Sequence, residues 1–152
     1  MFVIKEYNEK DSAAFAQLNR EWIEKYFEIE PQDELVFADP KAEILDKGGR
    51  IFYLYLDSVV VGTVSLIKES DSVFEVAKMA ITESIKGKGG GNLLLEHLIS
   101  EAKKMGISKL ELTGNTKLEA SIHLYKKFGF REIPLKNMPF KRGNIKMELV
   151  LK

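Results

Sequence analysis

A turn rich in lysine and glycine, KGKGGG at residues 86–91, is the stretch of this sequence best suited to bind a charged ligand. Glycine adopts turns that are closed to residues with a Cβ, so closely spaced glycines let several N–H groups point into one concavity. An apolar helical pattern follows directly, and a helix start adds unpaired N–H donors and the positive end of the helix dipole. Such a turn binds phosphate through its main chain, while Lys86 and Lys88 add positive charge. The turn predicts a site for an anionic ligand that carries a pyrophosphate, and the alternative is a plain glycine-rich connection.

Two familiar phosphate motifs do not fit this turn. The P-loop needs glycine at position 82 and Ser or Thr after Lys88, whereas the chain has Thr82 and Gly89. The dinucleotide pattern G-x-G-x-x-G, begun at Gly87, needs a third glycine where the chain has Asn92. The turn therefore belongs to another class of phosphate site.

One carboxylate stands in the apolar strand that precedes the turn. Residues 73–81 read VFEVAKMAI, and Glu75 interrupts the apolar run. A carboxylate in a central strand must be paired or must serve a function, because burying an isolated charge is costly. Glu75 is therefore a candidate general base, and the alternative is a solvated residue near the start of the strand.

Apolar periodicities outline the elements that would position these residues. The order of the elements indicates one α/β domain over residues 1–152, with four helices around a mixed sheet. We expect strands at 2–7, 50–57, 59–68, 73–82, 108–113, 130–134 and 144–151, and helices at 11–27, 40–47, from the glycine turn to 105, and at 116–128.

The composition narrows the functional class. Apolar residues make up 45% and charged residues 30% of the chain, as in ordinary soluble domains. The formal net charge is zero, so no overall field attracts nucleic acid or a membrane. The chain has no cysteine and two histidines, which excludes thiolate chemistry and argues against a metal site. No signal peptide or long apolar run is present, so we expect a cytoplasmic protein without a metal, nucleic-acid or membrane partner.

Two motifs resemble the signatures of the GNAT (GCN5-related N-acetyltransferase) superfamily. Residues 86–91 resemble its acyl-CoA signature Q/R-x-x-G-x-G/A, with Lys86 in place of Gln or Arg and Gly90 where an apolar residue is usual. Residues 124–130, LYKKFGF, resemble the end of its second signature, with Asn115 one residue further upstream than usual. A glycine in the first helical turn costs about 1 kcal/mol against alanine, so we expect Gly90 to loosen the turn. The resemblance extends over the whole chain and is closest to small bacterial members of uncharacterised function.

The resemblance implies a fold, a reaction and a set of ligand contacts. The fold would be an α/β (α+β) GNAT domain with a mixed, mostly antiparallel sheet of about seven strands and four helices on its two faces. The reaction would be transfer of an acetyl group from acetyl-CoA to a primary amine by direct attack, without a metal. The pantetheine arm would bond the main chain of the strand before the turn, and the pyrophosphate would lie on the turn. The implied cofactor-binding residues are Met79, Ala80, Ile81, Lys86, Gly87, Lys88, Gly89, Gly90, Gly91, Asn92, Asn115 and Tyr125.

The same resemblance assigns roles to three further side chains. Tyr125 would donate a proton to the departing thiolate, because a phenol with a pKa of about 10 stays protonated at neutral pH. Its alternative role is an aromatic residue on the inner face of a helix. The family's counterpart of Glu75 often holds a water that carries the amine proton away. Asn115 would bond the pantetheine arm or else cap the helix that follows.

The family places the amine acceptor between the first two helices and the loop that joins the last two strands. Residues 21–34 hold six carboxylates against Lys25, so we expect an acidic rim that attracts an ammonium group. Trp22 and Tyr26 could wall the pocket, and Arg142 could clamp the carboxylate of an amino-acid-like acceptor. A protein lysine or N-terminus as acceptor, a non-catalytic acyl-CoA-binding module and a site for another nucleotide stay open as alternatives. Sheet edges of this fold commonly pair, so a homodimer is a further expectation.

Overall fold

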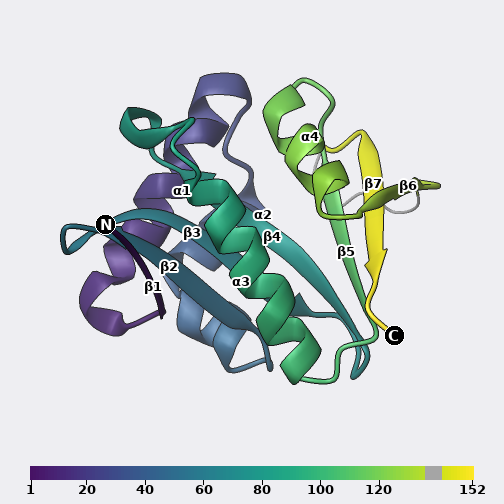
Figure 1. The fold of residues 1–152 in the computed structure, drawn as a ribbon. Helices are drawn as coiled ribbons and strands as arrows, with labels where there is room; N and C mark the ends of the chain where they lie inside the picture. Colours follow the sequence, from purple (N-terminus) through teal and green to yellow (C-terminus); the bar gives the residue numbers. More distant parts are fainter. Residues whose placement is uncertain (136–141) are drawn as a thin grey trace.

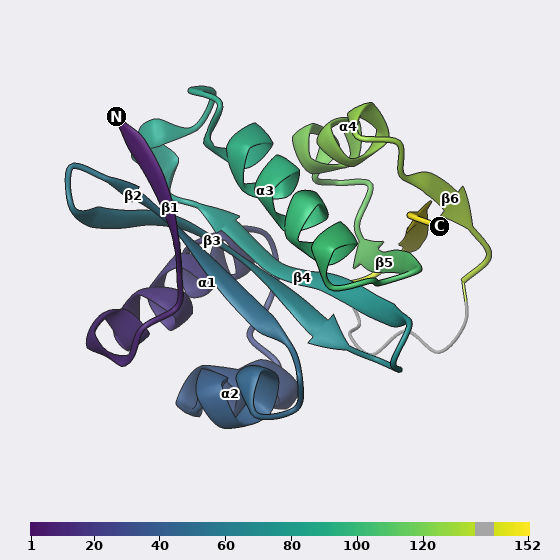
Figure 2. The ribbon, with the colours of Figure 1, turned by 60° about the horizontal axis from the view of Figure 1, so that its bottom comes forward.

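The computed structural model describes residues 1–135 and 142–152, which form one seven-stranded sheet in the order β1-β2-β3-β4-β5-β7-β6. All neighbouring strands in the described chain run antiparallel except β4 and β5, which are parallel. Figure 2 shows β1 and β6 at opposite edges of the sheet. The strands are β1 (Phe2–Glu6), β2 (Arg50–Leu56), β3 (Val59–Lys68), β4 (Val73–Ile81), β5 (Lys109–Gly114), β6 (Arg131–Ile133) and β7 (Ile145–Val150).

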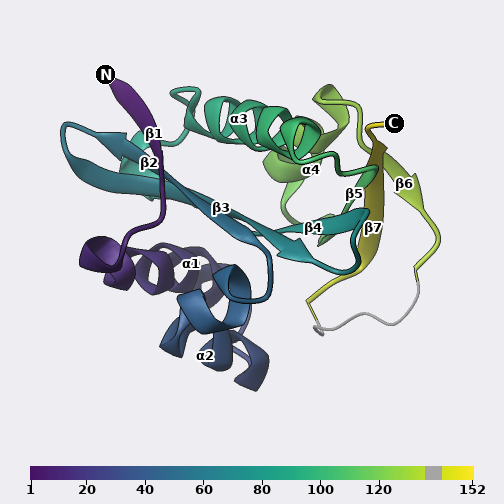
Figure 3. The same cartoon turned by 90° about the horizontal axis from the view of Figure 1, so that it is seen from below.

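Helices cover both faces of the sheet. Figure 3 shows α1 and α2 on one face and α3 with α4 on the other. Three short helical turns connect these elements. The α-helices are α1 (Ser12–Tyr26), α2 (Pro31–Ala38), α3 (Gly90–Lys104) and α4 (Glu119–Lys127), and the short turns are η1 (Glu9–Asp11), η2 (Lys41–Leu45) and η3 (Glu83–Ile85).

Two apolar cores follow from the alternation of side chains along the central strands. In β2, Phe52 and Leu54 face α3, whereas Ile51 and Tyr53 face α1 and α2, and all four are fully buried. In α3 an apolar stripe at three- and four-residue spacing packs on the sheet, and Leu98 is fully buried within it. These two cores hold the helices on the sheet and so fix the loops that bear the site.

The helices differ from the sequence expectation at two places. Residues 31–38 form α2, which was not expected, and the helix expected at 40–47 is a short π-helical turn at 41–45. Glu30 and Asp33 form a capping box around Pro31, which occupies the first helical turn. Glu30 and Pro31 were therefore a helix-start signal in the sequence, and the prediction did not use it. In addition, α4 begins at Glu119 and not at 116.

Strands β4 and β5 part after a short stretch of pairing. Residues 73–75 of β4 pair with residues 109–111 of β5, while β4 continues to Ile81 along β3. The two ribbons diverge beyond this stretch (Figure 1). The edge of β4 from residue 76 onward therefore has no strand partner on the β5 side among the described residues.

A β-bulge interrupts β4 along this open stretch. Ser65 faces Ala77 and Thr63 faces Ala80, so Lys78 and Met79 lie opposite the single residue Val64. Lys78 has φ = +53°, a left-handed conformation that is uncommon for residues other than glycine. The bulge turns the Lys78 side chain toward α2, as its contacts below show.

Candidate active site

A cavity of about 690 Å³ opens where β4 and β5 part. Its described lining comes from α1, the open edge of β4, the glycine turn, the end of β5 and α4. This lining includes every site residue predicted from the sequence except Lys88. The cavity therefore brings together residues that the sequence separates by more than 100 positions, Trp22 and Arg142 among them.

The glycine turn has the conformation that binding an anion requires. Gly87 and Gly89 have φ of +81° and +87°, in the left-handed region. A Cβ on either would meet nothing within 4 Å, so the backbone conformation, not crowding, selects glycine. The first bond of α3 runs from the Leu93 N–H to the Gly89 oxygen at 3.2 Å. The N–H groups of residues 90–92 thus lie outside the helical ladder, and no side chain caps this end of α3.

Gly90 has a packing role that the sequence expectation did not include. It is buried, and a Cβ at this position would lie 2.8 Å from Cδ2 of Leu54 in β2. The absence of a side chain lets the first turn of α3 approach the sheet closely. The neighbouring Gly91 is tight as well, since its Cβ would lie 3.3 Å from Cδ2 of Leu124.

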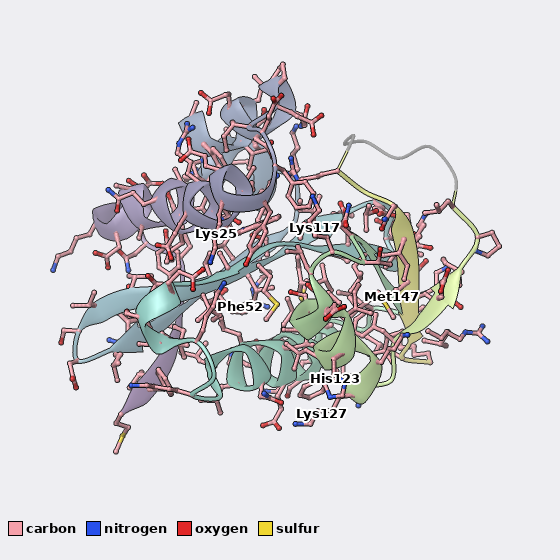
Figure 4. All side chains as sticks on the ribbon, turned by 90° about the horizontal axis from the view of Figure 1, so that it is seen from above. Lys25, Phe52, Lys117, His123, Lys127 and Met147 are labelled. Carbon is pink, nitrogen blue, oxygen red and sulfur yellow. The ribbon has the colours of Figure 1, made fainter. Side chains whose placement is uncertain are left out.

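Lysines surround the turn and tie it to other elements. Lys86 pairs with Glu83 at 3.1 Å, and Glu83 also pairs with Lys25 of α1 at 2.8 Å. Lys127 of α4 donates to Oδ1 of Asn92 at 2.7 Å, which joins α4 to the start of α3. Figure 4 shows Lys127 on the side of α3 and Lys117 on the side of α1. Lys127 was missed as a site residue, although it lies in the LYKKFGF motif next to the expected acid.

Tyr125 projects from α4 across the cavity toward β4. Its hydroxyl group donates to Sδ of Met79 at 3.9 Å, and its ring packs edge-on against Phe130 with centroids 5.8 Å apart. Burial raises the pKa of Tyr125 to about 12. The phenol therefore keeps its proton at neutral pH and can act as a donor next to the β4 main chain.

Glu75 is half-buried in the cavity wall. Burial raises the pKa of its carboxyl to about 7, the charge of Glu69 raises it further, and the charge of Lys78 opposes this shift. In residues 1–135 and 142–152 no hydrogen bond or ion pair holds its side chain. A carboxyl with a pKa close to 7 meets the requirement for a general base at physiological pH.

Asn115 joins two segments and does not cap α4. Its amide group donates to the Arg142 carbonyl, and its Oδ1 accepts the Lys117 N–H at 2.8 Å. The N-cap of α4 is Leu118. Asn115 therefore fixes the end of β5 beside the chain that enters β7, which corrects the expectation of a helix cap.

Aromatic rings from α1 line the acceptor side of the cavity, the side where the sequence analysis expects the amine. The Trp22 and Tyr26 rings lie 6.3 and 6.5 Å from the Phe27 ring, and all three line the cavity. Lys117 Nζ lies 5.0 Å from the Phe27 ring centroid, and the Arg142 guanidinium lies 5.7 Å from the Trp22 ring. Trp22 and Tyr26 therefore line the cavity with cations beside them, and their role toward an acceptor stays a prediction.

The expected acidic rim does not line the cavity. Asp33 is fully buried, Glu34 pairs with Arg20, and Glu21 accepts from Thr82 and from the Glu83 N–H. The carboxylates of residues 21–34 therefore either bind other groups of the protein or lie outside the cavity lining. The charged residues of the described lining are Lys78, Lys86, Lys117, Lys127 and Arg142 against Glu75 and Glu119.

Arg142 binds a carboxylate of the protein itself. Its two terminal nitrogens donate to the two oxygens of Asp33 at 2.8 and 2.7 Å, and one also reaches Glu30 at 3.3 Å. The structure thus places Asp33 where the sequence expectation placed the carboxylate of an acceptor. Lys78 joins the same carboxylate at 2.6 Å and was missed, although it too is a charged residue in an apolar strand.

Comparison with known proteins decides the family. Residues 13–130 match the family model for the acetyltransferase (GNAT) family. The chain belongs to this family. The GNAT fold, the N-acetyltransferase class and the family expected from the sequence are therefore confirmed.

Individual relatives of this GNAT chain are distant. It is 33% identical over 103 residues to the uncharacterized N-acetyltransferase YvbK of Bacillus subtilis, over 65% of this chain and 66% of that protein. A GNAT-family acetyltransferase from Staphylococcus aureus superposes over 100% of both chains with a TM-score of 0.89 and 21% identity. The putative acetyltransferase yncA of Salmonella typhimurium, solved with its cofactor acetyl-CoA, covers 99% of this chain and 94% of its own with a TM-score of 0.78 and 20% identity.

The described part of this GNAT chain contains neither a metal-binding cluster nor a helix suited to a membrane. No cluster of His, Asp and Glu side chains there could hold a metal ion. None of the helices described is both long enough and apolar enough to cross a bilayer.

Proposed function

We propose that the protein, acting as one domain over residues 1–152, transfers the acetyl group of acetyl-CoA to the primary amine of a small molecule that also carries an anionic group. One observation carries this proposal. A half-buried glutamate with a pKa near 7 and a protonated tyrosine line the same cavity, beside an open strand edge and a turn with free amides.

The binding half of the proposal rests on main-chain groups. The N–H groups of residues 90–92 suit a pyrophosphate, because they stand at the positive end of α3 without helical partners. Lys86 and Lys127, on either side of the turn, suit the remaining negative charge of the nucleotide. Met79, Ala80 and Ile81 line the cavity along the edge of β4 that has no strand partner, and this edge suits an extended, amide-bearing arm.

The chemical half rests on Glu75 and Tyr125. When bound, acetyl-CoA supplies the acetyl group as a reactive thioester. Glu75 in its ionised form accepts a proton from the acceptor ammonium, directly or through water, and so frees the amine to attack the carbonyl carbon. As the N–C bond forms and the C–S bond breaks, Tyr125 donates its hydroxyl proton to the departing thiolate. The nitrogen loses its second proton as the amide forms, and this proton restores the Tyr125 hydroxyl group, so the products are the neutral amide, the free thiol and one proton held at Glu75.

The charge of the lining supports an acceptor that carries an anion as well as an amine. Three cations line the cavity near the α1 rings, namely Lys78, Lys117 and Arg142. In the described chain, β4 contributes the carboxylate of Glu75 to the same lining. Lys117 has no carboxylate partner among the residues described, so its ammonium group is available to a ligand. A carboxylate or phosphate on the acceptor would pair with Lys117, whereas Lys78 and Arg142 already share the Asp33 carboxylate.

The test is a panel of matched primary amines with and without an anionic group. Glycine and glycinamide, phenylalanine and phenylalaninamide, and phosphoethanolamine and ethanolamine are supplied with acetyl-CoA, and release of the free thiol is measured. We expect amine-dependent release, with a higher kcat/KM for the anionic member of a pair. Acetyl-CoA binding without thiol release for any amine or peptide would favour a binding module, and release with lysine peptides alone would favour a protein acceptor.

A further inference from the structure

Three charged side chains from distant parts of the chain meet beneath the acceptor side of the cavity. Asp33 of α2 is fully buried, with 0% of its surface accessible, and it does not line the cavity. Its Oδ1 accepts from Lys78 of β4 at 2.6 Å and from Arg142 at 2.7 Å, and its Oδ2 accepts from Arg142 at 2.8 Å. Both partners of Asp33 line the cavity, whereas Asp33 lies behind them.

The carboxylate of Asp33 stays charged in this position. Burial raises the pKa of Asp33, but the hydrogen bonds from Arg142, from Lys78 and from the Glu30 N–H, the last at 2.9 Å, outweigh burial and bring it down to about 2. Burial lowers the pKa of Lys78, and the Asp33 contact opposes that shift. Buried ion pairs of this kind are weak contributors to stability, because desolvation offsets much of their attraction. Stability alone therefore does not account for this cluster, in which Asp33 and Lys78 are buried and Arg142 is half-buried.

The contacts of the two cations indicate what the carboxylate holds in place. The Arg142 guanidinium lies 5.7 Å from the Trp22 ring, which lines the acceptor side. Lys78 occupies the bulge in β4, three residues after Glu75, and its charge acts on that carboxyl. Since Lys78 and Arg142 repel each other, they can stand together only while a carboxylate bridges them.

From this geometry we infer that Asp33 is a positioning residue of the acceptor site, which fixes Lys78 and Arg142 and thereby the wall against which the amine lies. The inference rests on the proposed acetyl transfer. It predicts an effect on the acceptor that is separate from acetyl-CoA, because Asp33 belongs to α2 and the amides of residues 90–92 belong to α3, on the opposite face of the sheet (Figure 3). Loss of the Asp33 charge leaves the two cations without a bridge, so they move apart and the wall loses its shape.

Asp33→Asn tests this inference. The steady-state constants are measured with whichever amine of the panel above gives the highest turnover, and CoA binding is measured by calorimetry. We expect KM for the amine to rise at least tenfold, while the Kd for CoA and kcat change less than threefold. Glu34→Gln is the matched control, because Glu34 lies next in the same helix, is exposed and pairs with Arg20 at the surface. All its constants should stay within twofold of wild type.

A second pair of variants separates positioning from general damage. Asp33→Asn combined with Lys78→Met removes one of the two unbridged cations, so we expect it to recover part of the amine KM lost in Asp33→Asn. If Asp33→Asn does not fold, Arg142→Lys keeps the charge and loses the two-pronged contact, and should raise the amine KM at least fivefold without changing CoA binding.

The outcomes distinguish this inference from the proposed function. No thiol release by the wild-type protein with any amine would overturn the proposed function. Wild-type turnover together with an amine KM that changes less than twofold in folded Asp33→Asn would overturn the positioning role alone. An equal loss of CoA and amine binding would also overturn it, since this would reflect a general loosening of the fold.

Discussion

Replacing Glu75 by glutamine should remove activity and, at alkaline pH, make the protein more stable. The folded state holds the pKa of this carboxyl at about 7, mainly by burial, against 4.5 for an unperturbed glutamate. A shift of about 2.5 pH units corresponds to about 3 kcal/mol of free energy. Glutamine carries no charge and is free of this penalty at every pH.

The sign of the effect follows from which state binds the proton. Below pH 4.5 the carboxyl is protonated in both the folded and the unfolded chain, so its charge costs nothing. Between pH 4.5 and 7 the unfolded chain ionises while the folded chain keeps the proton, so wild-type stability falls as pH rises. Above pH 7 the loss is complete. The advantage of Glu75→Gln over wild type should therefore grow by about 2.5 kcal/mol between pH 5 and pH 8.

Urea unfolding of both proteins at pH 5 and pH 8 measures this difference. Any cost of packing the glutamine amide is the same at the two pH values and cancels. Glu96→Gln, at an exposed position of α3, is the control and should change stability by less than about 0.5 kcal/mol at either pH. An advantage of Glu75→Gln that is equal at pH 5 and pH 8 would refute the assignment of a raised pKa to Glu75.

Three further changes test other parts of the site. Tyr125→Phe should leave the Kd for CoA unchanged and lower kcat by up to about 100-fold, since it removes a proton donor, and an unchanged kcat would exclude Tyr125 as the acid. Gly89→Asp with Gly91→Asp should abolish CoA binding in calorimetry through repulsion of the pyrophosphate, and retained affinity would discredit the turn as its site. Gly90→Ala should destabilise the protein by about 1–3 kcal/mol in urea unfolding, because its Cβ would lie 2.8 Å from Leu54, and a stabilised variant would show that the turn relaxes freely.

The cofactor half of the site could be read from the sequence because it is local. The glycine turn, the strand before it and the LYKKFGF helix are each continuous segments whose conformation follows from their own residues. Glycine at 87 and 89 was expected to permit an unusual backbone, and both residues have positive φ. Glu75 was singled out because it stands in an apolar strand, and the structure places it half-buried in the cavity wall.

The acceptor half could not be read in the same way because its charges are paired over long sequence distances. Asp33 looks like a surface acid among five others, and only the fold brings it to Lys78 and Arg142, 45 and 109 residues away. The predicted acidic rim was therefore wrong. Arg142 was predicted to bind the carboxylate of an acceptor, but in the structure it binds the carboxylate of Asp33. Lys78 carried a usable signal, since the argument applied to Glu75 applies equally to a lysine in the same strand. The expected homodimer stays a prediction.

The most direct test of acetyl transfer through Glu75 compares thiol release by wild type and by Glu75→Gln under identical conditions. Both proteins are given saturating acetyl-CoA and increasing amounts of the best amine of the panel, at pH 8, where Glu75 is ionised. The account predicts amine-dependent release by wild type and a kcat/KM about 100- to 10,000-fold lower in the variant, with CoA binding intact. Equal kcat/KM in the two proteins would contradict it.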